Sequence, residues 1–240
     1  MSKTKTAIVT GASQGIGATI AQAFLDRGYN VVATSRSMSK SGFVPSSSLA
    51  LVDGDIGNSA TAERVAEAAL SKFGTIDHLV NNAGIYAAKP FTEYTVDDLR
   101  GFVSTNLDGF VFMTQIAVKQ MLAQGDGGSV TTITAALADN PIAGTPSSIP
   151  MITKGGLNAI TLSLANEYAR RHIRFNAVAP GIVNTPMHEA NPQDFLKTLS
   201  PMGTISDAQD VADAVVYLVE ARYVTGEVLH VDGGAHAGRW

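Results

Sequence analysis

The stretch TGASQGIG, residues 10–17, joins a short β-branched run to an amphipathic helical pattern. Its glycines, Gly11, Gly15 and Gly17, allow a tight turn and a close approach of other atoms to the backbone. A helix that begins here presents free N–H groups to an anion. Such a turn can also be purely structural, but the strand before it and the helix after it favour a nucleotide-binding turn. The stretch lacks the Gly-Lys-Ser/Thr ending of a P-loop, which argues against NTP hydrolysis.

On both sides of this turn, β-branched runs and helical patterns alternate along the whole chain. We expect strands at 6–10, 30–34, 49–52, 78–81, 129–134, 174–178 and 227–231. This alternation predicts an α/β fold, in which a doubly wound parallel sheet is covered by helices on both faces. The sequence shows neither an internal repeat nor a linker, so we expect residues 1–240 to form a single domain.

Several helix ends can be predicted from capping residues. Gly28 and Gly74 follow helical patterns and are expected to act as C-caps. Thr95 and Asp98 have the spacing of a capping box. Asp207 is expected to open the last helix.

Two segments interrupt the alternation. Residues 36–48 (RSMSKSGFVPSSS) are rich in serine and contain a proline, so a loop is expected where a covering helix would otherwise lie. Residues 186–204 form a long polar segment with the composition of a mobile substrate lid. Its apolar residues Phe195, Leu196 and Leu199 are available to close on another part of the molecule.

Composition argues against several classes of function. The formal net charge is −4 and no basic run is interleaved with aromatic residues, so nucleic-acid binding is not expected. The chain has no cysteine and its five histidines are scattered, so no metal site is expected. No stretch has the pattern of a signal peptide or the length of a membrane span. We therefore expect a cytoplasmic protein without a membrane partner.

The end of the second expected strand indicates which nucleotide would be bound. A carboxylate at this point accepts a hydrogen bond from a free ribose 2′-hydroxyl, whereas a basic side chain suits a 2′-phosphate. This chain has Ser35 followed by Arg36 and no carboxylate. The alternative interpretation is that Arg36 is a solvated loop residue. The pair favours NADP(H) over NAD(H) as the cofactor.

Five motifs occur here in the order typical of one family. They are TGxxxGxG at 10–17, NNAG at 81–84, Asp55 within VDGDI, the Pro-Gly that opens PGIVNTPM at 180–187, and VDGG at 231–234. The chain thus resembles the short-chain dehydrogenase/reductase family over residues 7–234. The resemblance implies a seven-stranded Rossmann-type sheet in the order 3-2-1-4-5-6-7 and a small-molecule substrate. It also implies a homotetramer or homodimer formed through the two long central helices.

The same resemblance assigns residues of this chain to the cofactor. The glycine-rich turn serves the pyrophosphate and ribose, residues 55–56 flank the adenine, residues 82–84 line the trough, and residues 180–185 hold the nicotinamide end. With the strand-end pair and a lysine, the expected cofactor-binding residues are Gly11, Ser13, Gln14, Gly15, Ile16, Gly17, Ser35, Arg36, Asp55, Ile56, Asn82, Ala83, Gly84, Lys154, Pro180, Gly181, Ile182 and Thr185.

This chain departs from the catalytic Asn-Ser-Tyr-Lys tetrad of the family it resembles. Asn106 and Lys154 match the Asn and the Lys, and the lysine is implied to grip the nicotinamide ribose. The position of the family's general acid, four residues before the lysine, is Pro150. The position of the substrate-orienting serine, in TTITAALA, is Ala135.

The surrounding residues do not restore the missing hydroxyl pair. The helix here is expected to begin with a cap at Ser147 or Ser148, and Pro150 is tolerated in its first turn. Thr134 and Ser148 carry hydroxyl groups, but neither is phenolic. Strand alternation should also point Thr134 away from the face of Ala135.

Three functions are compatible with this pattern. The first is an NADP(H)-dependent oxidoreductase with a modified proton path through Tyr86, a serine of SSIP (147–150) or water. Tyr86 follows NNAGI near the expected substrate mouth, and its alternative role is that of a packing aromatic. The second function is a cofactor-binding protein without turnover, which senses the NADP(H) pool or partners an active relative. The third is a structural subunit with an empty site, in which Asp55 and Lys154 would have no evident purpose.

Overall fold

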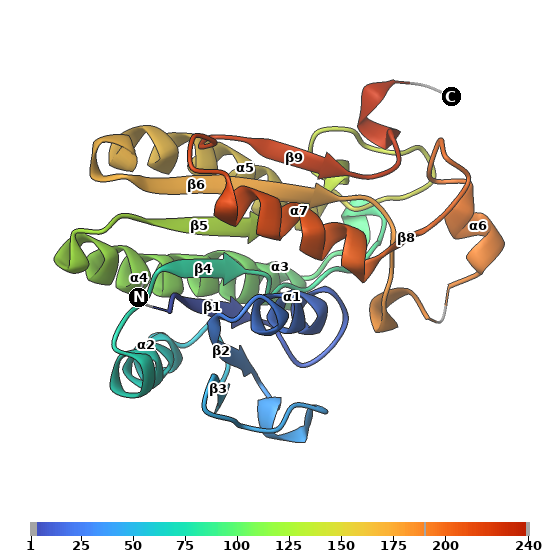
Figure 1. Cartoon of the computed structure of the whole chain (residues 1–240). Coiled ribbons are helices and arrows are strands. Elements are labelled where there is room, and N and C mark those ends of the chain that lie inside the picture. The colour runs from blue at the N-terminus through green and yellow to red at the C-terminus, as the bar shows by residue number, and fades with distance from the viewer. Residues whose placement is uncertain (1–3, 190, 239–240) are drawn as a thin grey trace.

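In the computed structural model, which describes residues 4–189 and 191–238, seven parallel strands form one sheet in the order β3-β2-β1-β4-β5-β6-β9. This order confirms the fold class and the strand order expected from the sequence. All strands run towards the same edge of the sheet, the edge beside which α6 lies in Figure 1. The strands are β1 (Thr6–Thr10), β2 (Asn30–Ser35), β3 (Leu49–Asp53), β4 (His78–Asn81), β5 (Gly128–Ile133), β6 (Ile173–Pro180) and β9 (Val228–Val231).

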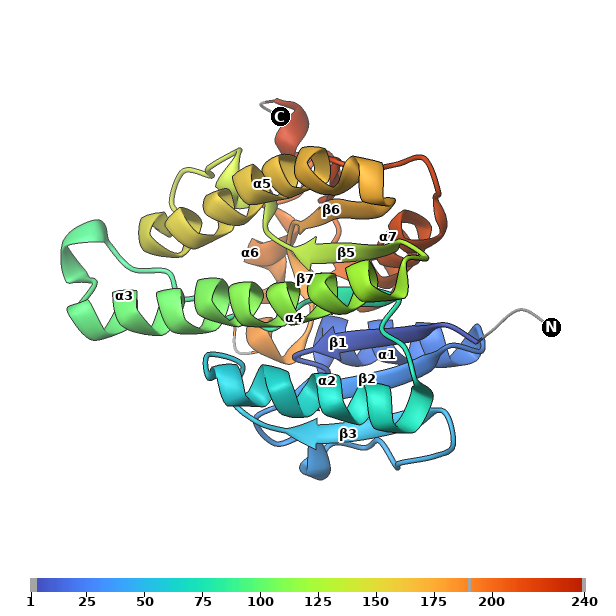
Figure 2. The ribbon, with the colours of Figure 1, turned by 90° about the vertical axis from the view of Figure 1, so that its left-hand side faces the viewer.

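The helices form one layer on each face of the sheet. Alternate residues of a strand point to opposite faces, so Val9 packs with α1 (Gly15–Asp26) and α7 (Ala208–Glu220). Its neighbour Ile8 packs with the other layer, which Figure 2 shows in front of the sheet. That layer contains α2 (Ser59–Phe73), α4 (Gly109–Gln124) and α5 (Ser148–Tyr168).

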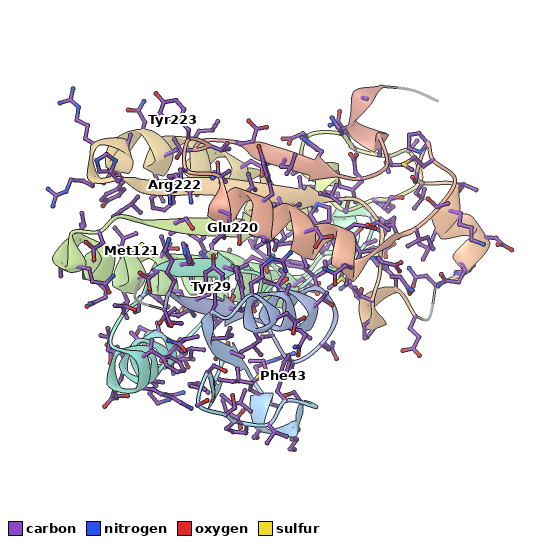
Figure 3. All side chains as sticks on the ribbon, viewed as in Figure 1. Tyr29, Phe43, Met121, Glu220, Arg222 and Tyr223 are labelled. Atoms are coloured by element: carbon purple, nitrogen blue, oxygen red, sulfur yellow. The ribbon has the colours of Figure 1, made fainter. Side chains whose placement is uncertain are left out.

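The 36–48 segment lacks an α-helix, as its composition predicts. It contains one short 3-10 turn at Met38–Lys40. Met38 is fully buried and Phe43 is partly buried against the core shared with α1, in the segment where Figure 3 labels Phe43. Two apolar side chains thus cover the sheet where a helix would otherwise lie.

Capping residues set most of the expected helix ends. Thr95 and Asp98 form the capping box at the start of α3 (Val96–Phe102), and Gly74 ends α2 in the left-handed conformation. Asp207 caps α7. Helix α1 has Arg27 as its C-cap, and Gly28 follows with φ +78°.

The N-cap position predicted for α5 is confirmed, but the capping hydrogen bond is absent. Ser147 occupies the N-cap position, but its side chain makes no capping hydrogen bond. The hydroxyl donates instead to the Thr145 carbonyl at 3.3 Å. Pro150 lies in the first turn, where its missing N–H leaves no helical hydrogen bond unmade.

The expected lid segment is bracketed by a small two-stranded sheet, β7 (Val183–Asn184) with β8 (Ser206–Asp207). Between them lie a 3-10 turn at Pro186–His188 and the short helix α6 (Gln193–Lys197), and position 190 lies outside the described residues. Leu196 and Leu199 are buried, as expected of a segment that closes on the molecule. Phe195 is 51% exposed and does not take part.

Candidate functional site

A cavity of about 480 Å³ opens at the carboxyl edge of the sheet. Its walls come from the β1–α1 turn, from the ends of β2, β4, β5 and β6, and from the residues just after β3. Open α/β sheets bind ligands in the crevice at this edge. Every residue that the sequence assigned to the cofactor lines this one cavity, together with Ala135.

The glycine-rich turn is locked to the segment that follows β4. Gly11 has φ +65°, and a Cβ atom there would lie 2.8 Å from the Ala83 Cα atom. A Cβ atom at Gly17 would overlap the Gly11 carbonyl. Asn82 Nδ2 donates to the Thr10 and Gly11 carbonyls at 2.9 and 3.2 Å. Only glycines let the two segments approach this closely, and the start of α1 is left facing the cavity.

The ends of β2 and β3 present a cation to the cavity. Ser35 and Arg36 both line it, and Arg36 is exposed, with no hydrogen bond or ion pair to the residues that the structure describes. Asp53, in register with Ser35, is held by Ser39, whose N–H donates at 2.7 Å. The hydrogen bonds that the Ser39 hydroxyl and N–H donate lower the pKa of the Asp53 carboxyl. The guanidinium of Arg36 is therefore available to an anionic ligand.

Lys154 projects from the second turn of α5 into the cavity. Its Nζ donates to the Ile133 carbonyl at 2.8 Å, and a Cβ atom at Gly84 would lie 3.3 Å from this nitrogen. Burial lowers the pKa of Lys154 to about 8, because desolvation disfavours the charged form. The lysine joins the end of β5 to the segment after β4.

Asn106 does not line the main cavity. It lies in a π-helical stretch, Val103–Asp108, between α3 and α4, and its side chain is buried. Its amide accepts from the Ile85 N–H at 2.9 Å and donates to the Ile85 carbonyl at 3.2 Å. A third hydrogen bond, at 3.0 Å, goes to Thr153 Oγ1. The side chain thus holds the cavity wall from behind.

The positions of Ala135 and Pro150 bring no hydroxyl group to the cavity. Ala135 lines the cavity just after β5, while Pro150 is buried in α5 and its carbonyl accepts from Thr153 Oγ1 at 2.7 Å. Thr134 lines the same cavity as Ala135, so the two residues do not separate as the strand alternation predicted, but the Thr134 hydroxyl donates to the Val178 carbonyl at 3.3 Å. Ser148 is exposed and is absent from the cavity lining.

Sequence reasoning missed several polar side chains of the site. Thr153 precedes Lys154 directly, and its link to Asn106 follows only from the fold. His188 lines the cavity, and its Nδ1 is buried without a partner among the described residues. Burial lowers the pKa of His188. Tyr86 also lines the cavity, as its place after NNAGI suggested.

The described residues contain neither a helix able to cross a membrane nor a cluster of three metal-ligating His, Cys, Asp or Glu side chains. A glycine-rich turn at a helix N-terminus, beside a cavity at the carboxyl edge of a parallel sheet, is the arrangement of dinucleotide-binding α/β proteins. A family model described as enoyl-(acyl carrier protein) reductase matches residues 11–236. The chain belongs to the short-chain dehydrogenase/reductase family.

Individual relatives resemble the chain over almost its whole length. An uncharacterized oxidoreductase of Methylorubrum extorquens is 37% identical over 246 residues, covering 96% of this chain and 97% of that protein. The 3-ketoacyl-(acyl-carrier-protein) reductase of Brucella melitensis, solved with NADH, has a TM-score of 0.90 at 30% identity and covers 97% and 98% of the two chains. A tyrosine-to-phenylalanine variant of ElxO, solved with NADPH, has a TM-score of 0.89 at 29% identity, with coverage of 98% and 100%.

Proposed function

We propose that this protein is an NADP(H)-dependent oxidoreductase that transfers hydride to or from a small carbonyl, imine or activated C=C substrate. The observation that carries the proposal is the single cavity lined by all the residues assigned to the cofactor, with Lys154 at its substrate end. The bound cofactor would supply the hydride chemistry itself. The chain would supply the binding, the orientation and the proton.

The preference for NADP(H) over NAD(H) rests on Arg36. A guanidinium pairs well with a 2′-phosphate, and no free carboxylate at the ends of β2 and β3 stands ready to accept from a 2′-hydroxyl. Among solved relatives, one is recorded with NADH and another with NADPH, so the choice depends on this chain's own residues. Titration with both reduced cofactors, followed by nicotinamide fluorescence, tests it. Equal or tighter NADH binding would contradict the assignment.

We further infer that Ala135 and Pro150 occupy the positions of the family's Ser and Tyr. A positioned general acid contributes roughly 10²–10⁴-fold and an oxyanion donor about 10²–10³-fold. An alkoxide-forming ketone reduction would suffer most from losing both. Hydride transfer to an iminium ion or an activated C=C bond creates no full alkoxide and would suffer less.

The catalytic part of the proposal is tested with NADPH and three probes: an acetoacetyl thioester, a cyclic imine and an enone. We expect slow turnover of the thioester and faster turnover of at least one of the other two. Loss of NADPH absorbance at 340 nm and identification of the reduced product are the measurements. Ketone reduction at rates ordinary for the family would show that the inferred impairment is wrong.

A second candidate function is an NADP(H)-binding protein without turnover, acting as a sensor or as the partner subunit of an active relative. The contrast between a complete cofactor wall and the hydroxyl-free Ala135 and Pro150 favours it. Tight NADPH binding without reduction of any probe would support this function over the first.

We also propose a homodimer or homotetramer built on α4 and α5, in a cytoplasmic protein of one domain with a substrate lid at 186–204. On α5, Ile152 and Leu162 are more than half exposed, and a Cβ atom at Gly155 or Gly156 would meet nothing within 4 Å. Such an open face suits close helix packing between subunits.

The oligomer can be tested by filling this open face. A Cβ atom at Gly156 meets nothing within 4 Å, so in Gly156→Leu the fold should persist while the oligomer weakens. Gly42→Leu, in the 36–48 loop and equally open, is the matched control. Light scattering at micromolar concentration should show the oligomer in the wild type and the control. A monomeric wild type would refute the proposal.

A further inference from the structure

Tyr86 lies on a cavity wall whose backbone is fixed from behind. Asn106 grips both polar groups of Ile85, accepting from the N–H at 2.9 Å and donating to the carbonyl at 3.2 Å. The same amide donates to Thr153, the residue before Lys154. The backbone that carries Tyr86 is thereby tied to the helix that carries Lys154.

Tyr86 and Lys154 line the same cavity. Tyr86 is two residues from Gly84, where a Cβ atom would lie 3.3 Å from Lys154 Nζ. Two residues of extended chain span at most about 7 Å, so the backbone of Tyr86 belongs to the same stretch of wall that contacts the lysine. Ala135 and Tyr86 line the same cavity, and the small Ala135 side chain leaves room there.

A serine hydroxyl lies near the phenol of Tyr86. Ser147 is only 8% exposed, and its hydroxyl is close enough to lower the pKa of Tyr86. This hydroxyl donates to the Thr145 carbonyl at 3.3 Å, and it is not used to cap α5. Tyr86 lines the cavity itself, so a phenol with a serine hydroxyl nearby is available there, on other elements than positions 135 and 150.

We propose that Tyr86 is the catalytic proton donor of this protein, with Ser147 as its positioning partner. The inference rests on the proposed oxidoreductase function. In the reduction of a ketone, the bound cofactor would supply the hydride that forms the C–H bond, and the carbonyl π electrons would move to oxygen. Tyr86 gives its proton to that oxygen, and the phenolate regains a proton from water.

The environment of Tyr86 sets how well it can do this. Burial raises the pKa of Tyr86, and the nearby Ser147 hydroxyl opposes the rise. The phenol is therefore fully protonated at neutral pH, but it is a weaker acid than a phenol whose pKa is lowered by an adjacent cation. Since general-acid efficiency follows acidity, this donor accounts for a ketone reductase that is slow but not inactive.

The test compares the wild type with Tyr86→Phe, using the acetoacetyl thioester and NADPH. Tyr217→Phe removes an exposed phenol on α7 and is the matched control. We expect kcat of Tyr86→Phe to fall at least about tenfold, since a positioned acid contributes roughly 10²–10⁴-fold and this one is weak. The Kd for NADPH should be unchanged. Ser147→Ala should lower kcat by a smaller factor.

A second readout does not depend on turnover. With tyrosine labelled at the ring carbon that carries the hydroxyl, Tyr86→Phe identifies the Tyr86 NMR signal. Addition of the product, a 3-hydroxybutyryl thioester, should shift that signal and leave the Tyr217 signal in place. An unshifted Tyr86 signal would overturn the proposal even if kcat fell, because the phenol would not touch the substrate.

The remaining outcomes separate the two proposals. Turnover that Tyr86→Phe leaves unchanged overturns the role of Tyr86 and leaves the oxidoreductase function standing. No turnover by the wild type, despite NADPH binding, overturns the oxidoreductase function and this role with it. At saturating NADPH, kcat should be level from pH 6 to 7, below the range in which Lys154, with its pKa of about 8, changes its charge. A kcat that declines steadily as pH rises from 5 would assign the proton to His188 instead, because burial lowers the pKa of that imidazole.

Discussion

The cofactor half and the substrate half of the cavity differ in how they are built. The cofactor half depends largely on backbone: the turn at 10–17, the segment at 82–84 tied to it by Asn82, and the strand ends. The substrate half depends on the functional groups of a few side chains. Ala135, which lines the cavity, carries no polar group, and neither does Pro150, which we propose stands at the position of the family's general acid.

Because of this difference, residues of one half of the cavity can change independently of the other half. A glycine such as Gly17 cannot be replaced without moving the turn, because a Cβ atom there overlaps a carbonyl. Pro150, in contrast, sits in a first helical turn, where proline costs little. The helix that aims Lys154 therefore persists whatever residue stands at position 150. A change of the residue at position 150 thus leaves the cofactor wall intact.

The largest expected effect comes from restoring the substrate half. The double variant Ala135→Ser with Pro150→Tyr should raise kcat for the acetoacetyl thioester by roughly 10²-fold or more. The reason is that Lys154 can then lower the pKa of a phenol four residues before it on the same helix. NADPH consumption by the wild type, each single variant and the double variant measures the gain.

The single variants make this test specific. Ala135→Ser alone adds an oxyanion donor without an acid, so its gain should be the smaller one. Because Pro150 is buried, the melting temperature of each variant is needed as well. A double variant that folds and binds NADPH but reduces the thioester no faster would show that position 150 is not where the proton is needed.

Most of the fold could be predicted because its determinants are local. The period of two in the strands places Ile8 and Val9 on opposite faces, and the Thr95–Asp98 spacing sets the start of α3. The capping hydrogen bond of α5 is missing because the Ser147 hydroxyl donates backwards to the Thr145 carbonyl, which the spacing of the sequence does not reveal. The exposure of Phe195 could not be predicted either, because a helix of one turn is too short for its apolar residues to show a helical period.

The candidate site was predictable where a motif fixes the backbone. The turn at 10–17 and the 81–84 segment meet at the cavity as expected, because each must follow a strand of a parallel sheet. The links of Asn106 to Ile85 and Thr153 were not predictable, because they join residues 21 and 47 positions apart. The contribution of His188 likewise depends on how the 186–204 segment folds back over the cavity.

Both halves of the cavity depend on Lys154, so its removal tests both of them at once. Lys154→Met should weaken NADPH binding by about 10–100-fold, the range for a hydrogen bond to a charged group. It should also stabilise the cofactor-free protein at pH 7. The folded pKa of Lys154, about 8, is below its unfolded value, so charge burial destabilises the fold fully at pH below 8. That cost disappears as pH rises towards 10.5.

The size of this stabilisation can be bounded. A pKa unit corresponds to 1.36 kcal/mol, so roughly 3 kcal/mol is the upper limit at pH 7, reduced by the lost hydrogen bond to Ile133. Thermal melts of the cofactor-free protein at pH 7 and pH 10 give the measurement. Lys5→Met removes an exposed lysine and should change neither value. A destabilised Lys154→Met protein at pH 7 would mean that the ammonium group is better solvated than its burial implies.

The smallest effect is expected at the far end of the cofactor half, at Arg36. Arg36→Ala should raise the Kd for NADPH by about tenfold or somewhat more, because one charge-assisted pairing with a 2′-phosphate is lost from an exposed position. The Kd for NADH should hardly change, since NADH has no such phosphate. The effect should shrink at high salt, because exposed charges are screened. Arg100→Ala, which removes an exposed arginine on α3, controls for net charge and should leave both affinities in place. If Arg36→Ala left NADPH binding unchanged, Arg36 would be a solvated loop residue, and only backbone and Ser35 would remain to distinguish the two cofactors.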